Sequence, residues 1–175
     1  MAGGTTKGTD MRIQGLHHSA YRCRDSEQTR AFYEDFLGLP LVNTLEIHAT
    51  KTGRLTDTLH TFFAMSDGSC LAFFEAPDMP FEFKPQHDYD LHIALQVDRT
   101  TLEAMLEKGR SLGMENRGIV DHRMFDSLYF RDPNGYVIEL ACKRSGHDDA
   151  MNGAQDQARA KLDRWTAARR AGQPR

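Results

Sequence analysis

Two histidines and one glutamate lie where they could bind a metal ion together. His18 and His92 each open a short apolar run of alternating polarity, and Glu139 lies within the last such run of the chain. Two imidazoles and one carboxylate make a facial triad, the ligand set that suits Fe(II) or Mn(II). Such a triad leaves coordination positions open for a substrate and for O2 or water, as a catalytic metal requires. A single histidine or glutamate in a strand is usually a hydrogen-bonded or solvated side chain, so the prediction depends on how the three are arranged.

The two histidines occupy equivalent positions in a repeated pattern. His18 begins the run HSAY, and His92 begins the run HIAL. Each run precedes a predicted helix that ends in Leu-Gly, and each half closes with a predicted hairpin that contains Gly68 or Gly135. The matched order and matched ends favour duplication of one unit over coincidence. This equivalence strengthens the interpretation of the two histidines as metal ligands.

Each half is expected to fold as a strand, a helix and three strands, which makes the domain α+β. Alternating apolar residues predict the strands, apolar residues at helical spacing predict the helices, and Gly38 and Gly113 predict where the helices stop. The first half is expected to contain a strand over 12–24, a helix from 25 or 26 to 37, and strands over 39–47, 56–65 and 69–75. The second half is expected to contain a strand over 91–97, a helix over 99–112, and strands over 115–121, 126–131 and 135–142.

The composition outside the two halves predicts the domain boundaries. Residues 1–10 are polar and rich in Gly and Thr, so we expect a disordered leader there and a domain over 11–143. Module one is expected over about 12–75 and module two over about 91–143. The linker between them, 76–90, contains prolines that interrupt both helices and strand ladders.

The tail, 144–175, is expected to contain a helix. Ala158, Leu162 and Trp165 form one apolar stripe within 155–170. The expected role of this helix is to pack Trp165 on the body of the protein or on a second subunit. Because the tail is rich in Lys and Arg, a basic arm for an anionic partner is the alternative.

Charge and cysteine content argue against several classes of protein. The 175 residues carry a formal net charge of −3, which gives no whole-chain attraction for nucleic acid. No apolar run approaches the ~20 residues that span a bilayer, and the N-terminus lacks the apolar core of a signal peptide. Cys23, Cys70 and Cys142 are widely spaced in apolar runs, where free cysteines act as small hydrophobes. We therefore expect a cytoplasmic protein with no nucleic-acid or membrane partner.

Two segments resemble the signatures of a known family. The opening LHHSAYRCRDSEQTRAFYEDFLGLPL and the closing SLYFRDPNGYVIELACK are similar to those of the glyoxalase/bleomycin-resistance/dioxygenase superfamily, which has the vicinal oxygen chelate fold. The resemblance covers residues 12–143. It implies two tandem βαβββ modules that form a curved-sheet cup around one metal site, to which a C-terminal helix is added here. It places the metal ligands at His18 (rather than His17), His92 and Glu139, and a homodimer is expected.

The chain departs from the four-ligand members of this family at one position. Glyoxalase I and methylmalonyl-CoA epimerase carry a further ligand on the last strand of the first half. Counted from the turn glycine, the position that corresponds to Glu139 is Ala72, which cannot bind a metal. Glu75 lies three residues further along, so its side chain should point to the opposite face of the strand. The pattern favours the three-ligand members, which are the extradiol ring-cleavage dioxygenases and the fosfomycin-resistance enzymes.

Other side chains could act on a substrate beside the metal. Tyr129 precedes Glu139 on the neighbouring predicted strand, where extradiol dioxygenases have a tyrosine, and His122 lies just upstream of that strand. An ordinary histidine, with a pKa of about 6.5, can carry a catechol proton at neutral pH. An exposed loop histidine is the alternative interpretation of His122. Weaker candidates for the pocket are His60 and the linker residues Phe81, Phe83 and Pro85.

These features predict an extradiol-type dioxygenase that acts on a catecholic or related vicinal-oxygen substrate. The ring would bind one Fe(II) through two oxygens, O2 would take the third open position, and His122 and Tyr129 would handle the protons. The enzymatic alternatives are a Mn(II)-dependent transferase of the fosfomycin-resistance kind, which uses the same triad, and a glyoxalase-type lyase. A further alternative is a non-catalytic binding protein like the bleomycin-sequestering members. Those members generally lack the triad, which counts against it.

Overall fold

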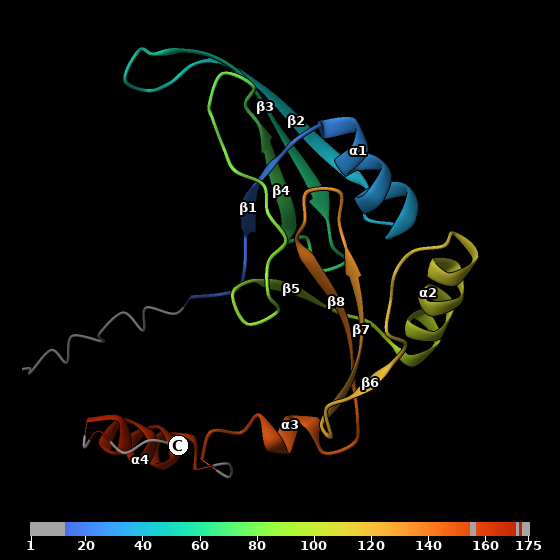
Figure 1. Cartoon of the computed structure of the whole chain (residues 1–175), viewed down its shortest axis with the longest axis vertical. Helices are drawn as coiled ribbons and strands as arrows, with labels where there is room; N and C mark the ends of the chain where they lie inside the picture. The colour runs from blue at the N-terminus through green and yellow to red at the C-terminus, as the bar shows by residue number, and fades with distance from the viewer. Residues whose placement is uncertain (1–12, 155–156, 171, 173–175) are drawn as a thin grey trace, which may run out of the picture. The chain divides into compact units, whose positions relative to one another are not determined.

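The computed structural model describes residues 13–154, 157–170 and 172, and Figure 1 shows the course of the chain. The chain divides into two compact units, Met1–Phe83 and Lys84–Arg175. The leader predicted over 1–10 lies outside the described residues.

The first unit contains one mixed four-stranded sheet with a helical segment packed on one face. Its strand order is β1-β4-β3-β2, in which β1 runs parallel to β4 and the other neighbours are antiparallel. The elements are β1 (His18–Cys23), α1 (Ser26–Arg30), η1 (Ala31–Phe36), β2 (Leu41–Ala49), β3 (Leu55–Ala64) and β4 (Cys70–Glu75).

Aromatic side chains form the core between the helical segment and this sheet. Tyr33 of η1 is fully buried, with its ring centroid 4.6 Å from that of Phe73 on β4 and 5.6 Å from that of Phe63 on β3. Leu71 is buried on the same side of β4 as Phe73. Because successive side chains of a strand point to opposite faces, this core leaves the alternate residues of β3 and β4 facing away from the helix.

The helical segment changes its hydrogen-bond pattern halfway. At its start, the side chain of Asp25 accepts a hydrogen bond of 2.8 Å from the N–H of Gln28, which is an N-cap. Further along, in η1, the N–H of Leu37 bonds to the carbonyl of Phe32, the wider spacing of a π-helix. The segment ends before Gly38, whose φ of +81° lies in the left-handed region, as the sequence predicts for a glycine stop.

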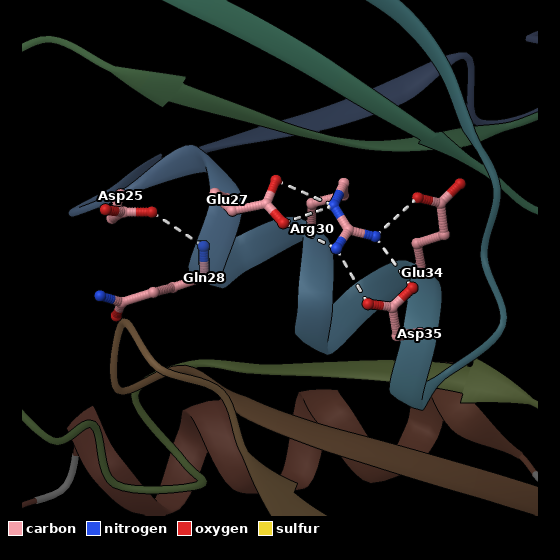
Figure 2. Close-up of polar contacts among 6 residues, drawn as sticks. All are labelled: Asp25, Glu27, Gln28, Arg30, Glu34 and Asp35. Carbon is pink, nitrogen blue, oxygen red and sulfur yellow. Dashed lines mark hydrogen bonds and ion pairs between the residues drawn. The ribbon is translucent and has the colours of Figure 1, made fainter.

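Figure 2 shows how Arg30 joins several carboxylates where α1 passes into η1. Its guanidinium donates to Glu27, Glu34 and Asp35 over distances of 2.7 to 3.0 Å. The second oxygen of Glu34 accepts a hydrogen bond of 3.0 Å from the N–H of Leu41, at the start of β2. The Leu41 N–H and the Arg30 guanidinium lower the pKa of Glu34. This cluster connects the end of the helical segment to the strand that follows it.

The second unit repeats the plan of the first. Its strand order, β5-β8-β7-β6, corresponds to that of the first unit, with β5 parallel to β8. The prediction of an α+β fold with two βαβββ modules and a C-terminal helix is confirmed. The elements are β5 (His92–Gln96), α2 (Arg99–Ser111), β6 (Val120–Asp121), β7 (Phe125–Arg131), β8 (Val137–Lys143), α3 (His147–Ala150) and α4 (Ala158–Arg170).

Helix α2 packs against one face of the second sheet. Leu102 and Met105 of the helix are buried, as are Leu128 and other residues at alternate positions of β7 and β8. Gly109 of α2 lies so close to the sheet that a Cβ there would be 2.5 Å from Cε1 of Phe130 on β7. The other face of this sheet carries His92, Glu139 and Tyr129.

Three elements of the second unit differ from expectation. A strand is predicted over 115–121, but β6 comprises just Val120–Asp121, because Gly118 takes a left-handed φ of +74° that interrupts the extended run. Helix α3 is not predicted from the sequence. On α4, none of the described residues is buried and Trp165 is 50% exposed, so the expected packing on the body of the protein is not seen and packing on a second subunit stays a prediction.

No helix formed by the described residues is long and apolar enough to cross a membrane.

Candidate metal and substrate site

In the first unit, His18 lies on the sheet face that points away from the helical segment. Residues paired across neighbouring strands share a face. Phe62 pairs with Ala72, and His60 pairs with Phe74, so these four side chains lie on one face. The ring centroid of His18 is 5.6 Å from that of Phe62 and 6.3 Å from that of His60. This face therefore brings a predicted metal ligand together with aromatic side chains.

His17 forms a hydrogen bond with one ring nitrogen of His18. The Nδ1 atoms of His17 and His18 lie 2.7 Å apart, a hydrogen-bond distance. Since Nδ1 of His18 is engaged in this way, Nε2 is the nitrogen with which His18 would bind a metal.

His60 is buried, with 5% of its surface exposed. Its Nδ1 lies 3.0 Å from the carbonyl oxygen of Phe73, and its ring stacks on Phe74 with centroids 3.6 Å apart and an interplanar angle of 7°. Burial lowers the pKa of His60, and the nearby His18 acts in the same direction, while the hydrogen bond to Phe73 opposes them. The ring is therefore neutral at neutral pH.

In the second unit, His92 and Glu139 form a close pair. Glu139 is the cross-strand partner of Ala94, two residues after His92 on β5. The Nδ1 of His92 lies 2.6 Å from the carbonyl oxygen of Asp88, and its Nε2 lies 3.3 Å from Oε2 of Glu139. Because a carbonyl can only accept, Nδ1 carries a proton, and Nε2 is the nitrogen that faces the carboxylate of Glu139. This orientation leaves Nε2 as the nitrogen with which His92 would bind a metal.

The carboxylate of Glu139 is buried, with 4% of the residue exposed. The hydroxyl of Ser127, itself fully buried, donates a hydrogen bond to Oε1 of Glu139. Among the residues that the structure describes, His92 is the one side chain within ion-pair distance of this carboxylate. A buried carboxylate is costly unless a positive charge accompanies it. A divalent cation held by Glu139 and Nε2 of His92 would supply that charge, so this donor set fits a divalent cation.

Tyr129 and His122 lie beside this pair. Tyr129 is the cross-strand partner of Glu139, and its hydroxyl is 3.1 Å from Nε2 of His122. Burial raises the pKa of Tyr129 and the charge of Glu139 raises it further, while Ser127 opposes them. The phenol therefore remains protonated at neutral pH and available as a hydrogen-bond donor. The structure brings the two residues into contact, and their catalytic role stays a prediction.

The three predicted metal ligands are divided between the two units. His18 belongs to the first unit, whereas His92 and Glu139 belong to the second. Over 13–154 and the other described residues, no three His, Cys, Asp or Glu side chains are grouped closely enough to hold a metal ion. The second unit by itself therefore contains two of the three predicted ligands, His92 and Glu139. The complete triad stays a prediction.

Ala72 and Glu75 take the positions expected from strand alternation. Ala72 is fully buried and pairs with Ala20 of β1, on the sheet face that carries His18. Glu75 points the other way, where its Oε2 accepts a hydrogen bond of 2.7 Å from the N–H of Ser26 at the start of α1. Its carboxylate therefore stabilises the start of the helical segment.

The linker aromatics pack on arginines from the first strand and the loop after it. The guanidinium carbon of Arg22 lies 5.1 Å from the ring centroid of Phe81, and that of Arg24 lies 4.4 Å from that of Phe83. Both arginines also donate to backbone carbonyls of this segment. These side chains line a cavity of about 380 Å³ in the first unit. The two phenylalanines thus hold the linker in place, as linker aromatics commonly do.

Three residues of the site were not among the sequence candidates. Ser127 lies two residues before Tyr129 in the same alternating run, so strand parity could have placed it on the site face. His17 was set aside as a ligand, but its ring holds that of His18. Asp88 acts through its backbone carbonyl, for which a sequence carries no side-chain signal.

Comparison with known proteins places the chain among related folds. The model of the Glyoxalase/Bleomycin resistance protein/Dioxygenase superfamily matches residues 15–140. A glyoxalase/dioxygenase from Nostoc punctiforme is 21% identical, with a TM-score of 0.59 over 82% of this chain and 100% of that one. A glyoxylase/bleomycin resistance protein/dioxygenase domain from Frankia sp. EAN1pec is 18% identical, with a TM-score of 0.61 over 78% of this chain and 96% of that one.

A further similar structure contains a metal. It is a variant of the fosfomycin resistance protein FosX from Listeria monocytogenes, in complex with Mn(II) and 1S,2S-dihydroxypropylphosphonic acid. It is 21% identical, with a TM-score of 0.58 over 78% of this chain and 98% of that one. At these identities the solved structures establish a shared fold and leave the reaction open.

Proposed function

Because the chain belongs to the glyoxalase/bleomycin resistance protein/dioxygenase superfamily, we propose that it is a metal-dependent enzyme that acts on a small vicinal-oxygen substrate. The reaction that we propose is the extradiol-type cleavage of a catecholic ring by O2. The ligands of one divalent cation, Fe(II) or alternatively Mn(II), would be His18, His92 and Glu139. We further propose that the working assembly is a homodimer.

The pairing of His92 with buried Glu139 is the observation that carries this proposal. Its two donor atoms lie 3.3 Å apart, and each belongs to a ligand type that Fe(II) and Mn(II) accept. Ser127 and the carbonyl of Asp88 hold the two groups in this orientation. Such supporting hydrogen bonds are typical of metal ligands.

A bound divalent cation would supply a Lewis acid that gathers two vicinal oxygens and O2. The chain's own residues would then position the ring and move protons. The hydroxyl of Tyr129 would donate a hydrogen bond to a substrate oxygen. His122, exposed and 3.1 Å from that hydroxyl, would accept a substrate proton at Nε2 and release it to water.

The overall reaction is balanced without an added reductant. One carbon–carbon bond beside a hydroxylated ring carbon breaks, the O–O bond breaks, and both oxygen atoms remain in the ring-opened product. The aromatic side chains of Phe62 and Phe74, on the same sheet face as His18, favour a flat aromatic ring as substrate.

A second candidate is a Mn(II)-dependent transferase of the fosfomycin-resistance kind, which would add water or a thiol to an epoxide phosphonate. It is favoured by the structural similarity to FosX, which was crystallised with Mn(II) and a vicinal diol. The same three ligands would serve, so the metal site alone does not separate the two reactions.

The test is anaerobic loading with Fe(II), followed by a panel of catechols and addition of O2. Ring cleavage should give a yellow product, with one O2 consumed for each product molecule, and His92→Ala should abolish both. Loaded protein that consumes no O2 with any catechol, but opens an epoxide phosphonate with Mn(II), would favour the second candidate. Tight binding of catechols without either reaction would indicate a binding protein.

A further inference from the structure

His60 lies on the same sheet face as His18 but is not one of the three proposed metal ligands. His60 comes from β3 and is edge-to-face with His18, at a centroid separation of 6.3 Å. We propose that Nε2 of His60 accepts a hydrogen bond from a substrate hydroxyl, and so selects hydroxylated aromatic rings over other vicinal-oxygen ligands. This inference rests on the proposed function, because it assigns the substrate class of the same site.

The backbone determines which nitrogen of His60 is the acceptor. Nδ1 lies 3.0 Å from the carbonyl oxygen of Phe73, which can only accept, so Nδ1 carries the proton. In the neutral ring, Nε2 then has a lone pair and no hydrogen. A group that meets Nε2 must therefore be a donor, such as a hydroxyl, and a carboxylate would be repelled.

The surroundings hold the ring in this orientation. His60 stacks on Phe74 at 3.6 Å and lies 4.2 Å from Phe62, centroid to centroid. A flip of the ring would separate Nδ1 from the carbonyl of Phe73 and lose this hydrogen bond. The ring thus offers Nε2 persistently in one direction.

Although His60 is only 5% exposed, its Nε2 is not completely enclosed. None of the described residues forms a hydrogen bond with this atom in the structure, and it is not one of the fully enclosed polar atoms of the described chain. One edge of the ring bonds to the backbone through Nδ1. The other edge presents Nε2 on the His18 face, where it could bind a substrate hydroxyl. Phe62 beside it provides an apolar surface for the substrate ring.

The test measures binding of two chelators to Mn(II)-loaded protein under argon. The probe 4-nitrocatechol offers a hydroxyl donor, whereas oxalate offers two vicinal oxygens and no hydrogen at neutral pH. His60→Asn places an amide near Nδ1 and keeps a donor for Phe73, but removes the acceptor at Nε2. His60→Gln places an amide near Nε2 and restores an acceptor there. The matched control is His48→Asn, an exposed histidine on β2.

We expect His60→Asn to weaken the Kd for 4-nitrocatechol about five- to tenfold, the effect of one hydrogen bond. The Kd for oxalate and the Mn(II) content should be unchanged. His60→Gln should recover part of the lost affinity, and His48→Asn should bind both probes as the parent does.

The other outcomes overturn the inference in distinguishable ways. If His60→Asn binds 4-nitrocatechol as tightly as the parent, His60 does not touch the substrate, and the proposed function stands. If it loses both probes to the same extent, His60 supports the fold or the metal ligands and does not select the substrate. If the Mn(II)-loaded parent binds neither probe, the proposed function fails and the inference fails with it.

Discussion

The Nε2 atom of His92 lies 3.3 Å from Oε2 of Glu139, while Nδ1 of the same ring bonds to the carbonyl of Asp88. Two donor atoms at this separation can reach one cation at about 2.1 Å each. The histidine and the carboxylate are therefore oriented for a common ligand by contacts within the second unit alone. Removal of either side chain should therefore lower the affinity for the metal.

His92→Ala and Glu139→Ala should each lower the bound Mn(II) or Fe(II) severely, because each removes one proposed ligand. Elemental analysis after dialysis measures the content, and circular dichroism checks the fold. His48→Ala, which removes an exposed histidine, is the control. Folded His92 and Glu139 variants with the metal content of the parent would show that the site assignment is wrong.

Ser127→Ala should weaken metal affinity about 10- to 100-fold, the usual effect of removing a group that orients a ligand. The buried hydroxyl donates to Oε1 of Glu139, so its loss frees the carboxylate to turn. Isothermal titration with Mn(II) measures the change. Ser111→Ala, which removes a hydroxyl bonded to its own helix on α2, should leave the affinity unchanged. Equal affinities for the two variants would remove Ser127 from the site.

His122→Ala should lower turnover of a confirmed catecholic substrate by about 10²- to 10⁴-fold, as expected for a general acid–base group. The acidic limb of the pH–rate profile should shift or disappear. Metal content should not change, because His122 contacts Tyr129 and is not a proposed ligand. A variant with the turnover and pH profile of the parent would make His122 an ordinary loop residue.

The buried carboxylate of Asp126 predicts a pH dependence of stability. Burial alone would raise its pKa, but hydrogen bonds from Arg99 and Arg144 outweigh burial and hold the pKa below its usual value. A group with a lowered folded-state pKa stabilises the fold above its unfolded pKa and loses this contribution as the pH falls through the folded one. The free energy of unfolding should thus decline below about pH 4.

Asp126→Asn should remove that part of the decline. At pH 7 it should also lower the free energy of unfolding by about 1–3 kcal/mol, because neutral amides bond arginines less strongly. Urea titrations of parent and variant from pH 2 to pH 7 provide the comparison. Two curves that stay parallel throughout this range would show that Asp126 does not contribute.

Gly109→Ala should destabilise the second unit, although alanine favours helices by about 1 kcal/mol. The new Cβ would stand 2.5 Å from the ring of Phe130, and overpacking of this kind costs about 1–3 kcal/mol. Thermal unfolding measures the loss, and adding Phe130→Leu should recover part of it by removing the ring edge. A single Gly109→Ala variant more stable than the parent would mean that the helix shifts at little cost.

The sheet faces could be predicted from the sequence because alternation has a period of two residues. HIAL and SLYF each place one set of side chains under a helix and the other on the open face, and His92 and Tyr129 both lie on the face of Glu139. The same parity explains why Ala72 and Glu75 point apart.

Other parts of the site could not be predicted in this way. The tautomer of His92 depends on the backbone carbonyl of Asp88, which any residue would provide. The strand expected over 115–121 was too long, because one positive φ at Gly118 outweighs the local preference for extended structure. The π-helical turn of η1, from which Tyr33 packs against the sheet, is likewise not indicated by helix propensity.

The parallel pairing in each sheet determines when the histidine-bearing strand can join. His18 on β1 pairs with the start of β4, and His92 on β5 pairs with the start of β8, each near the other end of its module. The β3–β4 and β7–β8 pairs, by contrast, close across short turns. Contacts between distant segments form more slowly than hairpins, because more chain entropy is lost before they are made. We therefore expect each histidine-bearing strand to join its sheet after the hairpin beside it has formed, so that the proposed metal ligands of both modules come together late in folding.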